Sequence, residues 1–251
     1  MARAYIGTSG WNYKGGKNDF YRGVPQARWL KHCAERFTGI EINGTFYRLQ
    51  SPGTFLKWHD QTPPDFRFTM KGHRFVTHNK KLKNSADSVA LERERAKPMG
   101  KKLAVVVWQL PKSLKKSMER LEAFAGNLDE WPWVRHAIEF RDESWFENGV
   151  AECLARHSIA ACQSDAADWP LWSAVTTDLV YVRLHGHTHT YASRYSDSLL
   201  DEWGEKTRKW LWEGRDVHVY FDNDSQGHAP WDALRLLKRI REQGKFRSGM
   251  A

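Results

Sequence analysis

The stretch Leu179-Val180-Tyr181-Val182-Arg183-Leu184-His185 decides the fold class of this 251-residue chain. It is an apolar, strand-forming run whose last residues carry a guanidinium and an imidazole. The same kind of ending recurs along the chain, and in most cases the polar residues alternate with apolar ones. The carboxyl ends of the strands of a parallel barrel meet at one mouth, so this pattern predicts a polar site there. The other endings are Glu41-Ile42-Asn43, Thr69-Met70-Lys71, Val107-Trp108-Gln109, Glu139-Phe140-Arg141, Gln163-Ser164-Asp165 and Asp222-Asn223.

Eight strand-like segments alternate with segments of helical periodicity, which favours a closed parallel barrel over an open sheet. The strands are expected at residues 4–6, 39–43, 66–71, 103–110, 137–141, 159–165, 179–185 and 217–223. Helices are expected at residues 26–37, 84–95, 113–124, 149–157, 198–213 and 230–243, and after Pro52. Residues 166–178 show no helical period, so we expect an irregular link between strands six and seven. The sequence predicts an α/β, TIM-barrel-like (β/α)8 closed parallel barrel, formed by a single domain over residues 1–251.

Composition narrows the cellular setting. The chain runs from its first residues directly into a strand, so no signal peptide is expected, and no stretch is apolar over the length of a membrane span. The three cysteines, Cys33, Cys153 and Cys162, are far apart and form no Cys-x-x-Cys pair, which is typical of reduced thiols. We therefore expect a cytoplasmic protein that does not contact the membrane.

The chain is basic, with a formal net charge of +9. Excess positive charge favours acidic partners, here a small anionic substrate or nucleic acid, and the alternative is a solvated basic surface. The charge is concentrated in two clusters, and the second is expected to cover the outer face of the helix at 113–124. The clusters hold Lys71, Arg74, Lys80, Lys81 and Lys83 in the first and Lys112, Lys115, Lys116 and Arg120 in the second.

Alternation along the strands indicates which side chains point into the barrel. In strands two, four, five and seven the polar residues share one face and their apolar neighbours share the other. Helices cover the outer face, so the polar set is expected to line the lumen. Asp222 and Asn223 are consecutive, so either of them could point inward. The inferred lumen holds Glu41, Asn43, Lys71, Gln109, Glu139, Arg141, Asp165, Arg183 and His185.

Two interpretations of this lumen compete. Carboxylates beside arginine and lysine in a low-dielectric pocket pair and stay charged, so the set could be only a structural ion-pair network. Each buried ion must be desolvated, however, and ordinary barrels fill the lumen with branched apolar side chains. A costly lumen without structural benefit favours a functional site.

Motifs spread over nearly the whole chain carry a family resemblance. They are Gly7-Thr8-Ser9-Gly10-Trp11, Glu41-Ile42-Asn43-Gly44-Thr45-Phe46-Tyr47, Phe66-Arg67-Phe68 leading to Lys71 and Thr77-His78, Gln109-Leu110-Pro111, Glu139-Phe140-Arg141, Ser144-Trp145-Phe146, Val182-Arg183-Leu184-His185-Gly186, Tyr195-Ser196-Asp197 and Tyr220-Phe221-Asp222-Asn223-Asp224. Their content and order resemble the domain of unknown function 72 family, also called the YecE-like family. The resemblance implies a TIM-barrel-like fold with a distant likeness to the endonuclease IV barrel, and no settled reaction. His187-Thr188-His189, and Asp222 in place of an expected Asn, depart from the family pattern.

We predict an enzyme of the hydrolase or lyase type that acts on a phosphorylated sugar or a nucleic-acid-derived substrate at the C-terminal mouth of the barrel. The candidate catalytic residues are Glu139, His185, Glu41 and Asp165, with His185 and one of Glu139 or Asp165 as the proton-transfer pair. The predicted substrate-binding residues are Asn43, Lys71, Gln109, Arg141, Trp145, Arg183, Tyr195 and Asn223. The guanidinium and ammonium groups of this set suit a phosphate or a carboxylate.

Two alternatives to this prediction follow from the same residues. A metal-dependent, endonuclease IV-like nuclease would use His185, His187 and His189 with Asp165 and Glu139 as ligands to Zn or Mn. Three neighbouring Arg and Lys side chains would repel a dication, so a polar loop without metal is favoured there. A non-catalytic barrel would bind nucleic acid through the basic stretch at residues 71–83. Walker-type and Gly-x-Gly-x-x-Gly loops do not occur in the sequence, so no cofactor is expected, and the oligomeric state is left open.

Overall fold

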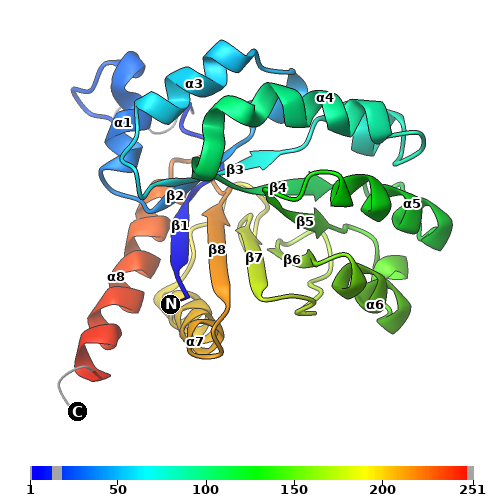
Figure 1. Ribbon diagram of the computed structural model, residues 1–251. Coiled ribbons are helices and arrows are strands. Elements are labelled where there is room, and N and C mark those ends of the chain that lie inside the picture. The colour runs from blue at the N-terminus through cyan, green and yellow to red at the C-terminus, as the bar shows by residue number, and fades with distance from the viewer. Residues whose placement is uncertain (1, 13–18, 248–251) are drawn as a thin grey trace.

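Eight parallel strands form one curled sheet in the computed structural model, which describes residues 2–12 and 19–247 (Figure 1). The order of the strands is β1-β8-β7-β6-β5-β4-β3-β2. The strands are β1 (Ala4–Thr8), β2 (Gly39–Ile42), β3 (Arg67–Lys71), β4 (Leu103–Gln109), β5 (Arg135–Glu139), β6 (Ile159–Asp165), β7 (Leu179–Leu184) and β8 (Asp216–Phe221). The predicted TIM-barrel-like (β/α)8 fold is confirmed.

Helices surround the sheet and connect most of the consecutive strands. Figure 1 shows the last helix, α8, running alongside β1 and β8, where the end of the chain closes over its beginning. Residues 166–178, between β6 and β7, form no helix, as the sequence predicted. The helices are η2 (Gln26–Arg28), α1 (Trp29–Ala34), α2 (Gly44–Tyr47), α3 (Pro52–Asp60), the π-helix η3 (Phe75–Asn79), α4 (Ala86–Ala96), η4 (Lys97–Lys102), α5 (Met118–Asp129), η5 (Glu143–Trp145), α6 (Asn148–Arg156), α7 (Asp197–Trp212) and α8 (Ala229–Arg247).

The barrel closes between β1 and β2, where Gly7 and Gly39 allow the two backbones to approach each other. Ser9 forms a parallel bridge to Glu41, and the Gly10 N–H donates a hydrogen bond of 2.7 Å to the Glu41 carbonyl. A Cβ atom added to Gly7 would lie 2.0 Å from the carbonyl oxygen of Gly39, which is closer than any side chain tolerates. A residue without a side chain is therefore needed at position 7 for this seam to form.

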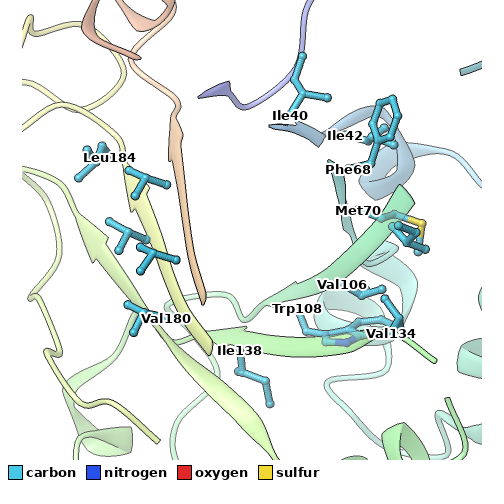
Figure 2. Close-up of a cluster of buried hydrophobic side chains, with 14 of the residues drawn as sticks. Ile40, Ile42, Phe68, Met70, Val106, Trp108, Val134, Ile138, Val180 and Leu184 are labelled. Atoms are coloured by element: carbon cyan, nitrogen blue, oxygen red, sulfur yellow. The ribbon is translucent and has the colours of Figure 1, made fainter. Parts of the chain in front are cut away.

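The two faces of the strands bury different kinds of side chains, as alternation predicted. The outer face packs against the helices, and Figure 2 shows part of this layer, including Ile40, Ile42, Phe68, Met70, Val106, Trp108, Ile138 and Val180. The inner face carries a second, smaller cluster, to which β7 contributes Tyr181 and β8 contributes Tyr220. Glu41, Glu139 and Arg183 have the inward parity and lie toward the carboxyl ends of their strands. The lumen is therefore packed with aromatic and small apolar side chains toward the amino ends of the strands. Its charged side chains lie toward the carboxyl ends.

Several elements begin or end at other residues than predicted, and two of these differences affect the site. The helix predicted at 113–124 begins only at Met118, because Leu114 is held in a turn: its N–H donates to the Pro111 carbonyl, and its own carbonyl accepts from the Trp145 indole at 2.8 Å. The prediction that the second basic cluster covers a helix face is therefore wrong for residues 112–116, which form the loop after β4. β5 begins and ends two residues earlier than predicted, so Arg141 lies beyond the strand.

The three cysteines are buried and form no disulfide. Burial raises the pKa of Cys33 to about 12, which keeps this thiol protonated, and Tyr21 Oη lies 3.0 Å from its sulfur. In the part of the chain that the structure describes, no helix combines the length and the apolar character that crossing a membrane requires.

Candidate functional site

Arg183 is the centre of a buried ionic network at the carboxyl end of the barrel. Its guanidinium donates two hydrogen bonds to Glu41, at 3.0 Å from Nε and 2.7 Å from Nη2, and one of 2.6 Å from Nη1 to Glu139 Oε2. Nη2 also lies 3.0 Å from Asp222 Oδ2. The side chains of Arg183, Glu41 and Glu139 are completely excluded from solvent. β2, β5 and β7 thus meet at one buried guanidinium, and the predicted convergence of these residues is confirmed.

Each buried glutamate has further donors. Glu41 accepts from Tyr181 Oη at 2.6 Å and from Ser9 Oγ at 2.7 Å, and Glu139 accepts from Ser164 Oγ at 3.2 Å. Burial favours the neutral acid at Glu139, but the positive charges of Arg141 and Arg183 outweigh it and hold the pKa of this carboxyl well below its usual range. Glu139 is therefore a permanent carboxylate near neutral pH and cannot donate a proton there.

His185 follows β7 and is buried between this network and the rings of Trp169 and Tyr191. Arg183 Nη1 donates to His185 Nε2 at 3.3 Å, and because a guanidinium only donates, Nε2 must be the acceptor and Nδ1 must carry the proton. Nδ1 lies 3.0 Å from Asp222 Oδ2, although out of line for a hydrogen bond. Asp222 rather than Asn223 thus faces the lumen, which decides the alternative that the sequence left open.

Arg141 links the network to an open cavity. Its Nε donates to Glu139 Oε1 at 2.9 Å, and its guanidinium carbon lies 4.0 Å from the centre of the Trp169 ring. Both Nη atoms lie 3.5 Å from Tyr191 Oη. The guanidinium is therefore fixed on three sides, which lowers the entropic cost of binding an anion.

The cavity that Arg141 lines has a volume of about 470 Å³, and its other lining side chains are mostly cationic and aromatic. A second, more open hollow of about 760 Å³ adjoins it and shares Lys112, Arg141, Asp168 and Trp169. A cavity of this size suits a small organic ligand. The first cavity is lined by Phe46, Tyr47, Lys71, His78, Gln109, Pro111, Lys112, Arg141, Asp168, Trp169 and Tyr191.

Lys71 ends β3 at the floor of this cavity. Its Nζ lies 4.2 Å from the centre of the Phe46 ring, and the residue is 8% exposed. Burial and the nearby charge of Arg183 lower the pKa of Lys71 to about 8, because they outweigh the attraction of Glu139 and Asp222. His78 lines the same cavity, and burial together with the charges of Lys71 and Arg74 lowers its pKa to about 4. The imidazole is therefore neutral at pH 7.

The remaining predicted site residues make their polar contacts within the protein. Gln109 lines the cavity, with Nε2 bonded to the Leu110 carbonyl at 2.7 Å. Trp145 is fully buried, stacks on Phe140 and donates to Leu114, which is a packing role. The others are bonded within the protein. Asn43 donates to the Ser9 carbonyl, Asp165 accepts from Tyr195 Oη at 2.7 Å, and Asn223 donates to Asp232 and to the Ser193 carbonyl.

Sequence reasoning missed several residues that line the cavity. The sequence groups Lys112 with a basic cluster expected on a helix face, Trp169 lies in a link without periodicity, and Tyr191 lies in the loop after β7. Pro111 gave one usable signal, because a proline that ends a strand at the mouth places the next residues in a loop beside the site. No comparable signal pointed to Trp169 or Tyr191.

The alternative metal site is not assembled at the mouth. His187 Nδ1 lies 2.9 Å from Asp165 Oδ1, while His189 Nδ1 lies 3.4 Å from Thr188 Oγ1. Within the described ranges, the one group of His, Cys, Asp and Glu whose ligand atoms converge is Glu122, Cys153 and His157, beside α5 and α6. Arg156 is paired with Glu122 there and opposes a cation.

Comparison with models of protein families identifies the family of this chain. The family model described as "Protein of unknown function DUF72" matches residues 5–249, which is almost the entire sequence. The chain belongs to the DUF72 family. Its motifs Glu41-Ile42-Asn43, Glu139-Phe140-Arg141 and Arg183-Leu184-His185 are the segments that build the ionic network and the cavity floor.

Relatives of this DUF72 member cover most of its length. UPF0759 protein YunF of Bacillus subtilis is 23% identical, over 94% of both chains. UPF0759 protein YecE of Escherichia coli is 29% identical over 53% of this chain, a match that spans 52% of YecE. The crystal structure of a DUF72 family protein from Thermotoga maritima has a TM-score of 0.85 and 28% identity, covering 95% of this chain and 99% of that one. The match to the Thermotoga maritima structure supports the barrel fold of this DUF72 protein.

Proposed function

We propose that this DUF72 protein is an enzyme of the hydrolase or lyase type that acts on a small phosphorylated sugar or nucleic-acid-derived substrate in the cavity at the C-terminal mouth. The observation that carries the proposal is the position of Arg141. Its guanidinium is anchored from below by a buried carboxylate and lines a cavity of substrate size. A guanidinium held in this way is suited to a phosphate group.

The charge around the cavity supports an anionic ligand. Lys71, Lys112 and Arg141 line the first cavity, and Lys115 lines the adjoining hollow. Among the described residues that line the first cavity, Asp168 is the one carboxylate against three cations, whereas Asp142 and Glu143 also line the adjoining hollow and balance its positive charges. Trp169 and Tyr191 offer flat faces and hydrogen-bonding tips beside the cations, which suits the carbon skeleton and hydroxyls of a sugar.

The buried network is assigned a positioning role. Glu41, Glu139 and Arg183 are excluded from solvent and bonded to one another, so a substrate in the cavity would reach them only through Arg141 and Lys71. Proton transfer is assigned instead to groups that line the cavity. His78 is neutral near pH 7, so its imidazole can accept a proton from the substrate.

Calorimetric titration with ribose 5-phosphate and with unphosphorylated ribose tests the proposal. The phosphate ester is expected to bind, and ribose to bind at least tenfold more weakly. Arg141→Gln should weaken binding of the ester at least tenfold, whereas Lys238→Gln, an exposed site on the outer helix α8, should leave it unchanged. Equal binding by wild type and Arg141→Gln would remove the basis of the proposal.

A second candidate function is binding of single-stranded nucleic acid at the rim of the cavity. Tyr47 and Phe75 are 68% and 46% exposed, and Lys80 Nζ lies 5.2 Å from the centre of the Phe75 ring. Exposed aromatic rings among cations are suited to stacking on bases. Binding to random single-stranded oligonucleotides that falls steeply between 20 mM and 200 mM salt, and is lost in Tyr47→Ala, would favour this function. No binding at the lower salt concentration would dispose of it.

A further inference from the structure

Lys71 differs from Lys102, the other buried lysine among the residues that the structure describes, in what its amine contacts. Lys102 Nζ donates to the carbonyls of His59 and Thr62, at 2.6 Å each, and to Thr62 Oγ1 at 3.2 Å, so its donors are satisfied as a structural lysine requires. Lys71 Nζ has no hydrogen bond and no carboxylate within 4.0 Å among residues 2–12 and 19–247, and it packs on the Phe46 ring. Burying an ammonium with so few partners costs folding free energy. A functional use of the amine accounts for its presence there.

The surroundings of Lys71 favour its neutral, nucleophilic form. Burial and the charge of Arg183 hold its pKa near 8, so an appreciable fraction is the free amine at neutral pH. The side chain also lines the cavity, so a ligand bound there can reach the nitrogen. Arg141 and Lys112 line the same cavity and can bind a phosphate, while the amine faces the carbon skeleton of the ligand.

We infer that Lys71 is a nucleophile that forms an imine with the aldehyde or keto carbon of an open-chain sugar phosphate held in the cavity. The inference rests on the proposed function and deepens it, because it names the substrate class as a carbonyl-bearing phosphate ester. It also favours a lyase over a hydrolase, since an imine activates neighbouring carbon bonds.

The chemistry balances without an oxidant, a reductant or a metal. The Nζ lone pair attacks the carbonyl carbon, the C=O π pair moves to oxygen, and a proton passes from nitrogen to that oxygen to give a carbinolamine. Loss of the hydroxyl with one further proton releases water and forms the C=N bond. In its protonated form the imine draws electrons from the adjacent carbon, and His78 can accept the proton that leaves this carbon. Water reverses the sequence and frees the product and the amine.

Borohydride trapping tests the inference directly. The protein is incubated separately with glyceraldehyde 3-phosphate, dihydroxyacetone phosphate and ribose 5-phosphate, reduced with borohydride, digested and mapped by mass spectrometry. Hydride adds to the imine carbon, so Lys71 is expected to gain the mass of a sugar phosphate less one oxygen atom. Labelling of Lys71 should exceed that of Lys102 and of the exposed Lys238 at least tenfold, and ribose without phosphate should label it at least tenfold less.

Lys71→Met separates failure of the inference from failure of the proposed function. If the inference holds, this variant loses the adduct and still binds the labelling sugar phosphate in calorimetry, with affinity within about tenfold of wild type. Binding without an adduct at Lys71, for all three compounds, would overturn the inference and leave the proposed site intact. Neither binding nor adduct in the wild type would overturn both. An adduct spread evenly over exposed lysines would overturn the inference as well.

Discussion

Arg183 Nη1 lies 2.6 Å from Glu139 Oε2, and neither side chain is reached by solvent. The same glutamate accepts from Arg141 through its other oxygen, so one carboxylate connects a guanidinium sealed in the barrel to a guanidinium that lines the cavity. The buried part of the site therefore sets the position of the accessible part. Desolvating these ions costs free energy. The orientation of Arg141, which the network fixes, is the benefit that accounts for this cost.

Replacing Arg183 should destabilise the protein strongly. Arg183→Met leaves Glu41 and Glu139 buried without their main counterion, so we expect a loss of about 3–5 kcal/mol in the free energy of unfolding. Urea denaturation at pH 7 measures it. Adding Glu41→Gln to this variant should restore part of the loss, because one uncompensated charge is removed. A double variant as unstable as the sum of its two single variants would show that the ion pair does not couple these residues.

Acid should destabilise the protein through Glu139 and Asp222. Both carboxyl pKa values are lowered in the folded state, in spite of burial, by the positive charges of neighbouring arginines, Arg141 and Arg183 at Glu139 and Arg183 at Asp222. The unfolded chain then binds more protons than the folded one between the two pKa values, so this stabilisation is complete above about pH 4.5 and is lost as the pH falls toward the folded values. Denaturation series from pH 7 to pH 3 should show this decline.

Glu139→Gln should reduce the loss of stability between pH 7 and pH 3. At pH 7 the variant should be less stable than wild type by about 2–4 kcal/mol, because two arginines lose their counterion. Glu152→Gln, on the exposed side of α6, serves as the matched control and should keep the wild-type profile. An unchanged loss of stability over this range in Glu139→Gln would mean that other carboxyls carry the acid sensitivity.

Lys71 should cost stability at neutral pH. Its folded pKa of about 8 lies below the ordinary value of 10.5, so between these values the unfolded chain holds a proton that the folded chain has lost. Stability due to this group therefore rises with pH through that window, and the full penalty applies below pH 8. Lys71→Met should raise the free energy of unfolding at pH 7 by up to about 3 kcal/mol, and the gain should shrink toward pH 10. A destabilised Lys71→Met would contradict the assignment of an ill-paired ammonium.

How far the sequence predicts the site depends on what alternation along a strand can specify. It specifies the face, and so it correctly placed Glu41, Glu139 and Arg183 on a common lumen. It does not specify how deeply a side chain is buried, and so it could not separate the fully buried His185 from Arg141, which lines the cavity. Loops have no period at all, and the positions of Lys112 and Trp169 depend on tertiary contacts such as the Trp145–Leu114 hydrogen bond that halts the expected helix.

The barrel seam should be intolerant of a single added methyl group. Gly7→Ala places a Cβ within 2.0 Å of the Gly39 carbonyl, so β1 and β2 must separate, and we expect a loss of about 2–4 kcal/mol. Gly53→Ala is the control, since its Cβ would meet nothing closer than 3.9 Å on the exposed helix α3. That variant should gain about 0.5–1 kcal/mol from helix propensity. Similar stabilities for the two variants would show that the seam adapts.

Two lysines of the loop after β4 should contribute unequally to anion binding. Lys115 Nζ lies 2.5 Å from Asp142 Oδ2, so its charge is largely neutralised, whereas Lys112 has no ion pair among the described residues and lines both cavities. Lys112→Gln should weaken binding of ribose 5-phosphate about three- to tenfold, which corresponds to about 0.6–1.4 kcal/mol. Lys115→Gln should weaken it less than twofold. Calorimetry at low ionic strength measures both, because screening would hide the difference at high salt. A larger effect at Lys115 would mean that the anion lies in the open hollow rather than over Arg141 and Lys71.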